Sequence, residues 1–267
     1  MGNALFIVWR ESVEAMLVVG ILYAWIKRND GAGMRALWAG AAAGIALAAA
    51  LGWAMVAAQD ELSGAALEWF QLAMLLTAAA LIVQMVLWMQ KHGRHMKQQL
   101  ENDMARAAQR SGAAGVAVIA ALAIAREGAE TAIFLYGMGL SGGDGTALAA
   151  GAALGFALAL LTAWAVSSGL RFLDYRQFFR VSGLLLLLFA AALLASAVDR
   201  LIGGGWLPAL VDPLWDSSAL LDDASGGGAA LAAFTGYRAR PSLTLAAVYA
   251  LYWLGIVVAQ RRRASHG

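Results

Sequence analysis

Seven long apolar stretches constrain the fold of this chain more than any other feature of its sequence. A helix that crosses a bilayer needs about 20 apolar residues, because the hydrocarbon core is about 30 Å thick and each helical residue advances about 1.5 Å. The stretches lie at about 3–26, 36–58, 66–90, 115–139, 147–170, 181–202 and 243–260. We therefore predict an all-α polytopic membrane protein with seven transmembrane helices.

The composition excludes most other classes of protein. Of the 267 residues, 61% are hydrophobic and 13% are charged, whereas a soluble domain carries about 25% charged residues. The chain has no cysteine, which excludes disulfides, zinc–thiolate sites and thiol catalysis. Arg10 interrupts the first apolar stretch and no basic segment precedes it, so we expect this stretch to be a retained span and not a cleaved signal.

Basic residues mark every second connection between the spans. Fourteen of the 19 lysines and arginines fall in these alternate connections: Lys27, Arg28, Arg35, Lys91, Arg94, Lys97, Arg106, Arg110, Arg171, Arg176, Arg180, Arg261, Arg262 and Arg263. Because positively charged loops stay in the cytoplasm, we predict that the N-terminus is outside and the C-terminus inside. This orientation requires an odd number of spans, as the seven stretches provide.

Acidic residues follow the opposite distribution. Nine of them fall in the connections predicted to be outside: Asp60, Glu61, Glu68, Asp144, Asp199, Asp212, Asp216, Asp222 and Asp223. Only Arg200, Arg238 and Arg240 accompany them. A surface of this kind concentrates cations, although the alternative is that outer loops simply need polar residues.

The chain contains an internal repeat. Residues 40–53 align with 151–164 at a constant offset of 111, with eight of 14 positions identical, including two glycine pairs and a tryptophan. Helices one to three therefore correspond to helices four to six. Because three spans is an odd number, the second copy must be inverted, which is an architecture of transporters with a site near the midplane. Each glycine pair, Gly40/Gly44 and Gly151/Gly155, predicts close helix packing.

We treat residues 1–267 as a single transmembrane domain. Its predicted parts are repeat one at about 1–98, a cytoplasmic loop at about 91–114, repeat two at about 115–202, a periplasmic loop at about 203–242 and a last helix at about 243–260. The outer loop holds all three prolines and a glycine run. We expect it to be irregular, with a short helix or a re-entrant segment near 229–234.

Two R-E-x-x-E motifs lie inside the first and fourth spans. Their charged residues are Arg10, Glu11, Glu14, Arg126, Glu127 and Glu130. At about 100° per residue, each motif places both carboxylates and the guanidinium on one side of its helix. The arginine can therefore pair with the glutamate four residues later.

The motifs indicate a binding site for a hard cation. Each charged residue at a helix centre costs roughly 2.5–3.5 kcal/mol to insert, so six such groups must face one another and not lipid. Structural Arg–Glu bridges are the alternative, but a bridge needs only one glutamate per motif. Oxygen-only ligands suit Mg, Ca, Mn and ferric iron.

Paired R-E-x-x-E motifs in the first and fourth of seven helices closely resemble the high-affinity ferric iron permeases, which are oxidase-dependent iron transporters. Residues 215–225 (WDSSALLDDAS) and 236–242 (GYRARPS), followed by Tyr249 and Tyr252, are similar to the last loop and helix of that family. The resemblance covers essentially the whole chain. It implies that Glu11, Glu14, Glu127 and Glu130 handle iron, and we assign Arg10 and Arg126 to their support.

The same resemblance implies where the protein works and with what. We expect a multi-pass permease of the bacterial inner membrane that is surrounded by lipid and receives ferric iron from periplasmic iron-binding or cupredoxin-like oxidase proteins. Iron is the transported substrate; we expect no permanently bound cofactor, no nucleic-acid partner and no enzymatic activity. Glu68, near the outer end of the third span, and Asp222 and Asp223 in the outer loop are candidates for receiving the ion first.

Two other functions stay open on the sequence alone. A different carrier, for a divalent metal or coupled to protons, would use the same glutamates without an oxidising partner. An intramembrane metalloenzyme is the second alternative, but zinc hydrolases usually need histidine ligands. No span contains a histidine away from its end, so transport is the better reading.

Overall fold

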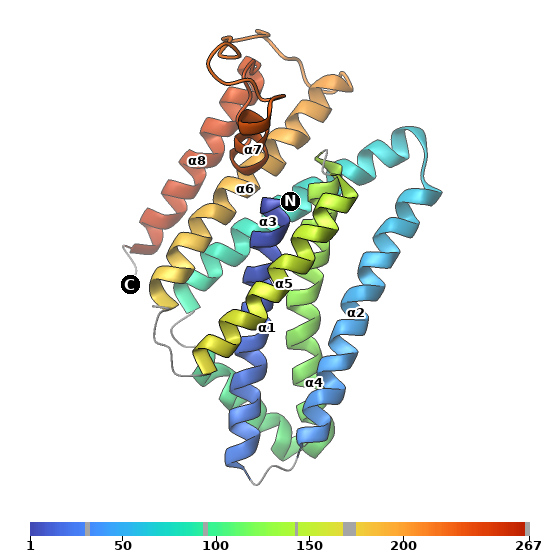
Figure 1. The fold of residues 1–267 in the computed structure, drawn as a ribbon, viewed down its shortest axis with the longest axis vertical. Helices are drawn as coiled ribbons and strands as arrows, with labels where there is room; N and C mark the ends of the chain where they lie inside the picture. The colour runs from blue at the N-terminus through green and yellow to red at the C-terminus, as the bar shows by residue number, and fades with distance from the viewer. Residues whose placement is uncertain (30–32, 93–95, 142–143, 168–174, 265–267) are drawn as a thin grey trace. The chain divides into compact units, whose positions relative to one another are not determined.

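A computed structural model describes residues 1–29, 33–92, 96–141, 144–167 and 175–264. The described residues form helices and connections, and no strand occurs among them (Figure 1). The helices are α1 Gly2–Arg28, α2 Met34–Glu61, α3 Gly64–His92, α4 Met96–Leu140, α5 Gly145–Ser167, α6 Tyr175–Gly203, α7 Gly226–Thr235 and α8 Leu243–Ala264. The prediction of an all-α protein is confirmed.

Six of the described helices are long and apolar enough to cross a membrane, namely α2 to α6 and α8. The chain is therefore a multi-pass membrane protein. Helix α1 coincides with the first predicted span but is not among the six. It is 27 residues long and holds Arg10, Glu11 and Glu14 near its middle. The count of seven spans and the orientation of the termini stay predictions.

The segment predicted as a polar loop at about 91–114 is largely helical. Helix α4 begins at Met96 and breaks only at Gly112, which has φ 55° and ψ −134°. Glycine tolerates this conformation because it has no Cβ. A Cβ on Gly115 would lie 2.8 Å from the carbonyl carbon of Ala107, so the chain turns sharply here. Polarity alone suggests a loop, whereas residues 96–111 form a helical segment, the polar limb of α4. It precedes the largely apolar residues 113–140, the spanning limb of α4.

The short helix predicted near Ala229–Phe234 is confirmed as α7. It ends at Gly236, whose φ of 75° is typical of a helix C-terminus. Hydrogen bonds hold the rest of this segment in place. The Ser217 backbone N–H donates to the Ala239 carbonyl at 2.9 Å, and the Leu243 N–H donates to the Val211 carbonyl at 2.9 Å.

The chain divides into two compact units. The first contains Met1–Leu67 and Met89–Phe178, and the second contains Glu68–Trp88 and Phe179–Gly267. The first unit therefore holds α1, α2, α4 and α5, and the second holds most of α3 together with α6, α7 and α8. Each unit draws on both halves of the sequence, and the single domain stays a prediction.

Glycines set the packing of α2 on α4 in the first unit. A Cβ on Gly44 would lie 2.7 Å from the Ala121 carbonyl oxygen and 2.9 Å from the Cβ of Ile124. Gly40 faces Ala117 in the same way, one turn earlier on both helices. The close packing predicted for this glycine pair is confirmed.

The second glycine pair packs α5 on α1. A Cβ on Gly155 would lie 3.0 Å from the Trp9 backbone nitrogen and would also meet Leu5, while Gly151 faces Met1. The contact of Gly40 with Ala117 therefore recurs as the contact of Gly151 with Met1. The two glycines are related by an offset of 111, and Met1 and Ala117 by an offset of 116. The offset of 116 also relates the two R-E-x-x-E motifs.

Helices α1 and α4 run antiparallel in the first unit (Figure 1). Near the middle of α1, Glu11 lies beside Glu127 of α4. Toward the end of α1, Val18, Leu22 and Ile26 pack with a cluster that includes Ala120, Val116 and Met104. Residue numbers therefore rise along α1 as they fall along α4, and this direction is the one that the repeat predicts.

The second unit has its own core. Ala78 of α3 and Ala190 of α6, related by the repeat at an offset of 112, are both fully buried. The Tyr252 hydroxyl on α8 donates to the Leu187 carbonyl on α6 at 2.8 Å. The guanidinium of Arg238 donates to Asp199 at 2.8 Å, which joins the segment before α8 to α6.

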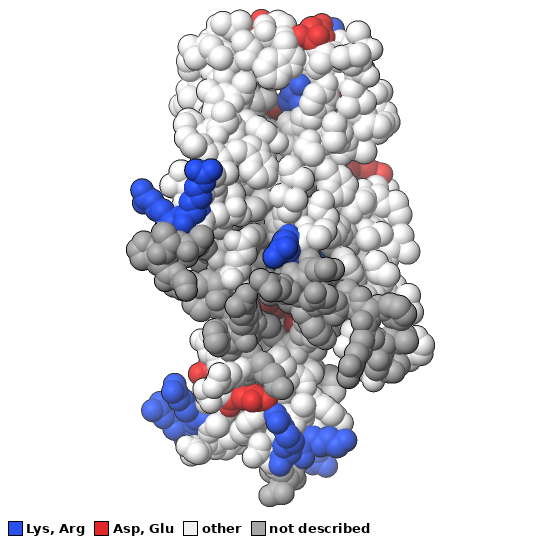
Figure 2. Space-filling view, turned by 90° about the vertical axis from the view of Figure 1, so that its left-hand side faces the viewer, with Lys and Arg blue, Asp and Glu red and all other residues white. Residues whose placement is uncertain are grey.

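The surface is suited to lipid. The face drawn in Figure 2 is mostly uncharged, with lysine and arginine gathered in a few places. Large apolar side chains are exposed along α2 and α5, for example Trp53, Leu161 and Trp164. Exposed apolar surface on this scale marks contact with membrane or protein, and the helix lengths favour the membrane.

Candidate metal site

The first R-E-x-x-E motif is buried in the middle of α1. Arg10 is 1% exposed, and its Nη1 donates to the Glu11 carboxylate at 2.7 Å. Its Nη2 pairs with the carboxylate of Glu14, which is the i, i+4 pairing predicted from helical geometry. The same Nη2 donates to the Met89 sulfur at 3.3 Å. One guanidinium therefore fixes both carboxylates of this motif.

The second motif lies in the spanning limb of α4 and makes the equivalent i, i+4 pair. The Nε of Arg126 donates to the Glu130 carboxylate at 3.1 Å. The Arg126 side chain is 49% exposed, in contrast to Arg10. The Glu127 backbone carbonyl accepts a hydrogen bond from the Thr131 hydroxyl at 2.9 Å, whereas the Glu127 carboxylate accepts none from the described residues.

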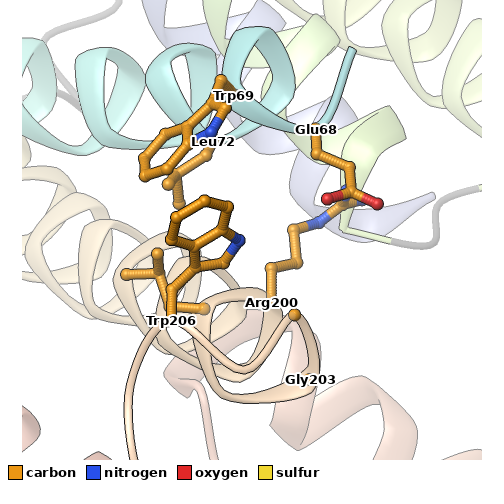
Figure 3. A pocket seen from close by; sticks show the side chains of 8 residues that line it. Glu68, Trp69, Leu72, Arg200, Gly203 and Trp206 are labelled. Atoms are coloured by element: carbon orange, nitrogen blue, oxygen red, sulfur yellow. The ribbon is translucent and has the colours of Figure 1, made fainter. Parts of the chain in front are cut away.

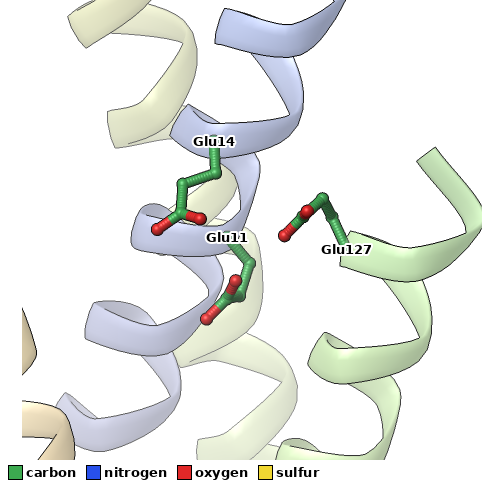
Figure 4. A group of neighbouring side chains, drawn as sticks. All are labelled: Glu11, Glu14 and Glu127. Atoms are coloured by element: carbon green, nitrogen blue, oxygen red, sulfur yellow. The ribbon is translucent and has the colours of Figure 1, made fainter. Parts of the chain in front are cut away.

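Carboxylates from both motifs meet in one group. One oxygen each from Glu11, Glu14 and Glu127 lies within 4.8 Å of the others (Figure 4). Figure 4 shows Glu127 reaching from α4 toward the two glutamates of α1. We expected carboxylates of the two motifs to face each other, and for these three they do. Among the described residues, Glu130 is not part of this group.

Several buried oxygens of the site have no protein partner. Within the described part of the chain, Oε2 of Glu11 and Oε2 of Glu130 accept no hydrogen bond. Each of these carboxylates is paired with an arginine through its other oxygen. A buried acceptor atom without a partner still costs free energy, so the two Oε2 atoms point to a ligand. The two motifs together hold four carboxylates and two guanidinium groups, a formal charge of −2 that a polyvalent cation would neutralise.

The geometry suits a hard metal ion. Oxygen ligands bind such ions at about 2.0–2.6 Å, so two ligands on opposite sides of one ion are separated by about 4–5 Å. The three carboxylate oxygens lie within that range. Glu11, Glu14 and Glu127 could therefore bind one ion with small adjustments, and they offer only oxygen atoms to it.

Sequence reasoning missed Met89, which lies at the end of α3 that belongs to the first unit. Its sulfur accepts a hydrogen bond from Arg10, and its side chain is buried. Methionine is a common packing residue in apolar helices, so nothing in the sequence separated Met89 from the other nine methionines. Only the fold identifies it as a neighbour of the site.

Glu68, a candidate for receiving the ion first, lines a pocket of about 300 Å³ in the second unit (Figure 3). Trp69 and Trp206 also line this pocket, with ring centroids 4.7 Å apart. Arg200 lines the same pocket and donates to Gln71 at 2.6 Å. Glu68 therefore shares its pocket with the guanidinium of Arg200, which the hydrogen bond to Gln71 holds in place.

The other two candidates, Asp222 and Asp223, precede α7. Asp222 accepts a hydrogen bond from the Ala224 N–H at 3.0 Å, and its carbonyl accepts one from the Ser225 hydroxyl at 2.8 Å. Asp222 therefore shapes the turn that begins the helix. Asp223 is partly buried. Within the described residues, neither these acids nor Glu68 belong to the three-carboxylate group.

Comparison with known proteins finds relatives over nearly the whole chain. The iron permease FTR1 family matches residues 1–264. A protein of Escherichia coli O157:H7 named ferrous iron permease EfeU is 30% identical over 256 residues, covering 95% of this chain and 92% of that protein. A protein of Yersinia pestis with the same name is 29% identical over 255 residues, covering 94% and 90%. No solved structure matches the chain.

Proposed function

The chain belongs to the iron permease FTR1 family, and from this premise we propose that it moves iron across the bacterial inner membrane through the carboxylates of its two R-E-x-x-E motifs. The observation that carries the proposal is the three-carboxylate group of Glu11, Glu14 and Glu127. Ionisable residues inside spans are functional in most membrane proteins. Here they come from two helices that lie far apart in the sequence.

Each charged residue has a role in this proposal. Glu11, Glu14 and Glu127 replace part of the water shell of the ion. Glu130 completes the set of four glutamates when Arg126 releases its carboxylate. Arg10 holds Glu11 and Glu14 in a fixed geometry, and both arginines limit the negative charge of the site before the ion arrives.

We propose that the ion is ferric while it occupies this site. The three carboxylates offer only oxygen atoms, which suit hard cations, and the Met89 sulfur beside the first motif is engaged by Arg10. The named relatives are called ferrous iron permeases, and uptake measured under oxidising and reducing conditions distinguishes the two oxidation states.

We further propose that an inverted repeat carries the ion by alternating access. Three observations support it: α1 and α4 run antiparallel, the glycine contacts recur at offsets of 111 and 116, and both motifs pair arginine with glutamate at i+4. In such folds the site lies near the midplane, and one repeat moves against the other. The N-terminus faces the periplasm in this arrangement.

The outer surface and its partners complete the proposal. The acids of the outer connections concentrate the cation, and Glu68, Asp222 and Asp223 are the candidates for receiving it. A periplasmic iron-binding or cupredoxin-like oxidase protein delivers the iron. A carrier of another hard cation, divalent or exchanged for protons, is the alternative, because the same oxygen ligands serve those ions.

Uptake of radioactive iron tests the function and the oxidation state together. Cells that lack their own iron importers and express the chain are given the isotope with ferric citrate, with ascorbate, or with a membrane-impermeant ferrous chelator. We expect uptake that persists with the ferrous chelator present. Uptake abolished by that chelator contradicts the ferric form. Absence of iron uptake in all conditions, with uptake of manganese or calcium, favours the alternative carrier.

A further inference from the structure

An apolar groove in the first unit has two of the site carboxylates in its lining. The groove has a volume of about 570 Å³ and is lined by residues of α1, α2, α4 and α5. Glu11 and Glu127 are its only ionisable lining residues among those described, apart from the phenol of Tyr23. Cavities of this size bind compact, drug-sized molecules.

The groove opens where the first unit exposes apolar side chains. Tyr23, Trp38, Ile45, Phe156 and Leu160 line it, and all five are also exposed at the surface. These residues belong to α1, α2 and α5. In a multi-pass membrane protein, exposed apolar side chains on spanning helices face acyl chains. A molecule dissolved in the bilayer can therefore reach the groove.

The carboxylates in the groove still have capacity for a cation. Glu11 is 1% exposed, and its Oε2 accepts no hydrogen bond from the described residues. The Glu127 carboxylate likewise accepts none from them. An apolar cavity that contains carboxylates with free acceptor atoms favours a ligand with the opposite charge and its own N–H donors.

Repeat-related residues line the groove from both halves of the chain. Glu11 and Glu127 are related by the offset of 116, and Ile45 and Phe156 by the offset of 111. The groove is therefore built where the two halves meet. A ligand in it touches both halves at once, as the metal ion does in the proposed site.

We propose that this groove binds a lipophilic ammonium compound from the bilayer. Its charged nitrogen pairs with Glu11 and Glu127, and its apolar body packs between Trp38, Ile45 and Phe156. Such a ligand excludes a metal ion from the same carboxylates. The inference rests on the geometry of the carboxylates and the groove, and it does not depend on iron being the cargo.

A compact primary amine is the suitable probe. The probe is tritium-labelled 1-aminoadamantane, and the purified full-length protein is held in lipid nanodiscs free of metal ions. The matched control ligand is 1-adamantanol, which has the same cage and no charge. We expect saturable binding of the amine above the level of empty nanodiscs and at least about tenfold weaker binding of the alcohol, because charge-assisted hydrogen bonds to carboxylates are strong.

Two substitutions test the groove and the carboxylates separately. Ile45→Trp narrows the groove without removing a charge, and Leu47→Trp is its control, since Leu47 is exposed on the same helix outside the groove. Glu127→Gln removes one carboxylate, and Asp103→Asn is its control on the exposed polar limb of α4. We expect both test variants to weaken amine binding about tenfold or more and both controls to leave it unchanged.

The outcomes separate this inference from the function proposed above. Equal binding of amine and alcohol, or no saturable binding by the unaltered protein, overturns the inference even where iron uptake is intact. Displacement of the bound amine by ferric or manganous ions supports the shared carboxylates. Amine binding in a protein that transports no iron leaves the inference standing and removes the proposed cargo.

Discussion

We expect the two arginines of the repeated motifs to contribute unequally to stability, although the motifs match residue for residue. Arg10 is 1% exposed and binds Glu11, Glu14 and Met89. Arg126 is 49% exposed; because charged residues inside spans face the bundle interior or a water-filled cavity, we expect its exposed part to face such a cavity. Arg10→Met and Arg126→Met therefore remove the same charge from different surroundings.

The expected difference follows from burial. Removing one partner of a buried ion pair costs about 3–5 kcal/mol, because the other charge stays buried without compensation. Arg10 serves two buried carboxylates, so its removal belongs in this range. Pairs that water reaches are worth about 0–1 kcal/mol, and the Arg126–Glu130 pair has one half-exposed partner, whereas both partners of the Arg10 pairs are buried.

Thermal unfolding of the metal-free protein in detergent measures the difference. Each kcal/mol shifts the midpoint of a chain of this size by roughly 2–4 °C. We expect Arg10→Met to lower the midpoint on the order of 10 °C and Arg126→Met to lower it by at most about 4 °C. Equal losses, or a larger loss for Arg126→Met, contradict the environments that we assign to the two motifs.

Four further predictions use matched variants. Glu11→Gln and Glu127→Gln should abolish iron uptake at normal membrane levels, because amides are poor ligands for hard cations; uptake equal to that of the control Asp103→Asn contradicts the site. Arg10→Lys should impair iron uptake more than Arg126→Lys, since lysine lacks the planar fork that holds two carboxylates; equal uptake rates would leave only a counter-charge role. Gly44→Ala should overpack α2 on α4 and lower the free energy of unfolding by about 1–3 kcal/mol, which a lower unfolding midpoint would report. Gly20→Ala is the control: nothing lies within 4 Å of its added Cβ, so the midpoint should rise slightly. Met89→Leu should lower the free energy of unfolding by about 0.5–1.5 kcal/mol, because the hydrogen bond from Arg10 is lost. Met85→Leu is the control, since Met85 is also buried on α3. If Met89→Leu destabilises the protein no more than Met85→Leu does, the bond to Arg10 contributes nothing.

Much of the fold could be predicted from the sequence because apolar length and glycine placement are local signals. The stretch at 36–58 became α2, Met34–Glu61, and its glycine pair marked the contact with α4. The polar limb of α4 could not be predicted in this way. Its charged and small residues are typical of both exposed loops and exposed helices. The helix is interrupted only at Gly112, where the polar limb ends.

The site could be predicted in part. Helical geometry predicted that Arg10 pairs with Glu14 and Arg126 with Glu130. The inverted repeat predicted that the two motifs face each other. The sequence could not predict which carboxylates would meet, because Glu127 and Glu130 have the same chemistry and differ only in the direction of their side chains. That direction depends on the packing of α4 against α1 and α2.

The unequal surroundings of the two motifs are already present in the sequence, outside the motifs themselves. Arg10 donates to the sulfur of Met89 on α3. At the offset of 112 that relates Ala78 to Ala190, the counterpart of Met89 is Leu201, whose side chain has no acceptor atom. The two aligned halves of the sequence therefore share the charged residues, whereas the methionine that accepts from Arg10 aligns with a leucine. We therefore propose that Glu11 and Glu14, both held by Arg10, form the fixed side of the site and that Glu127 approaches them from α4.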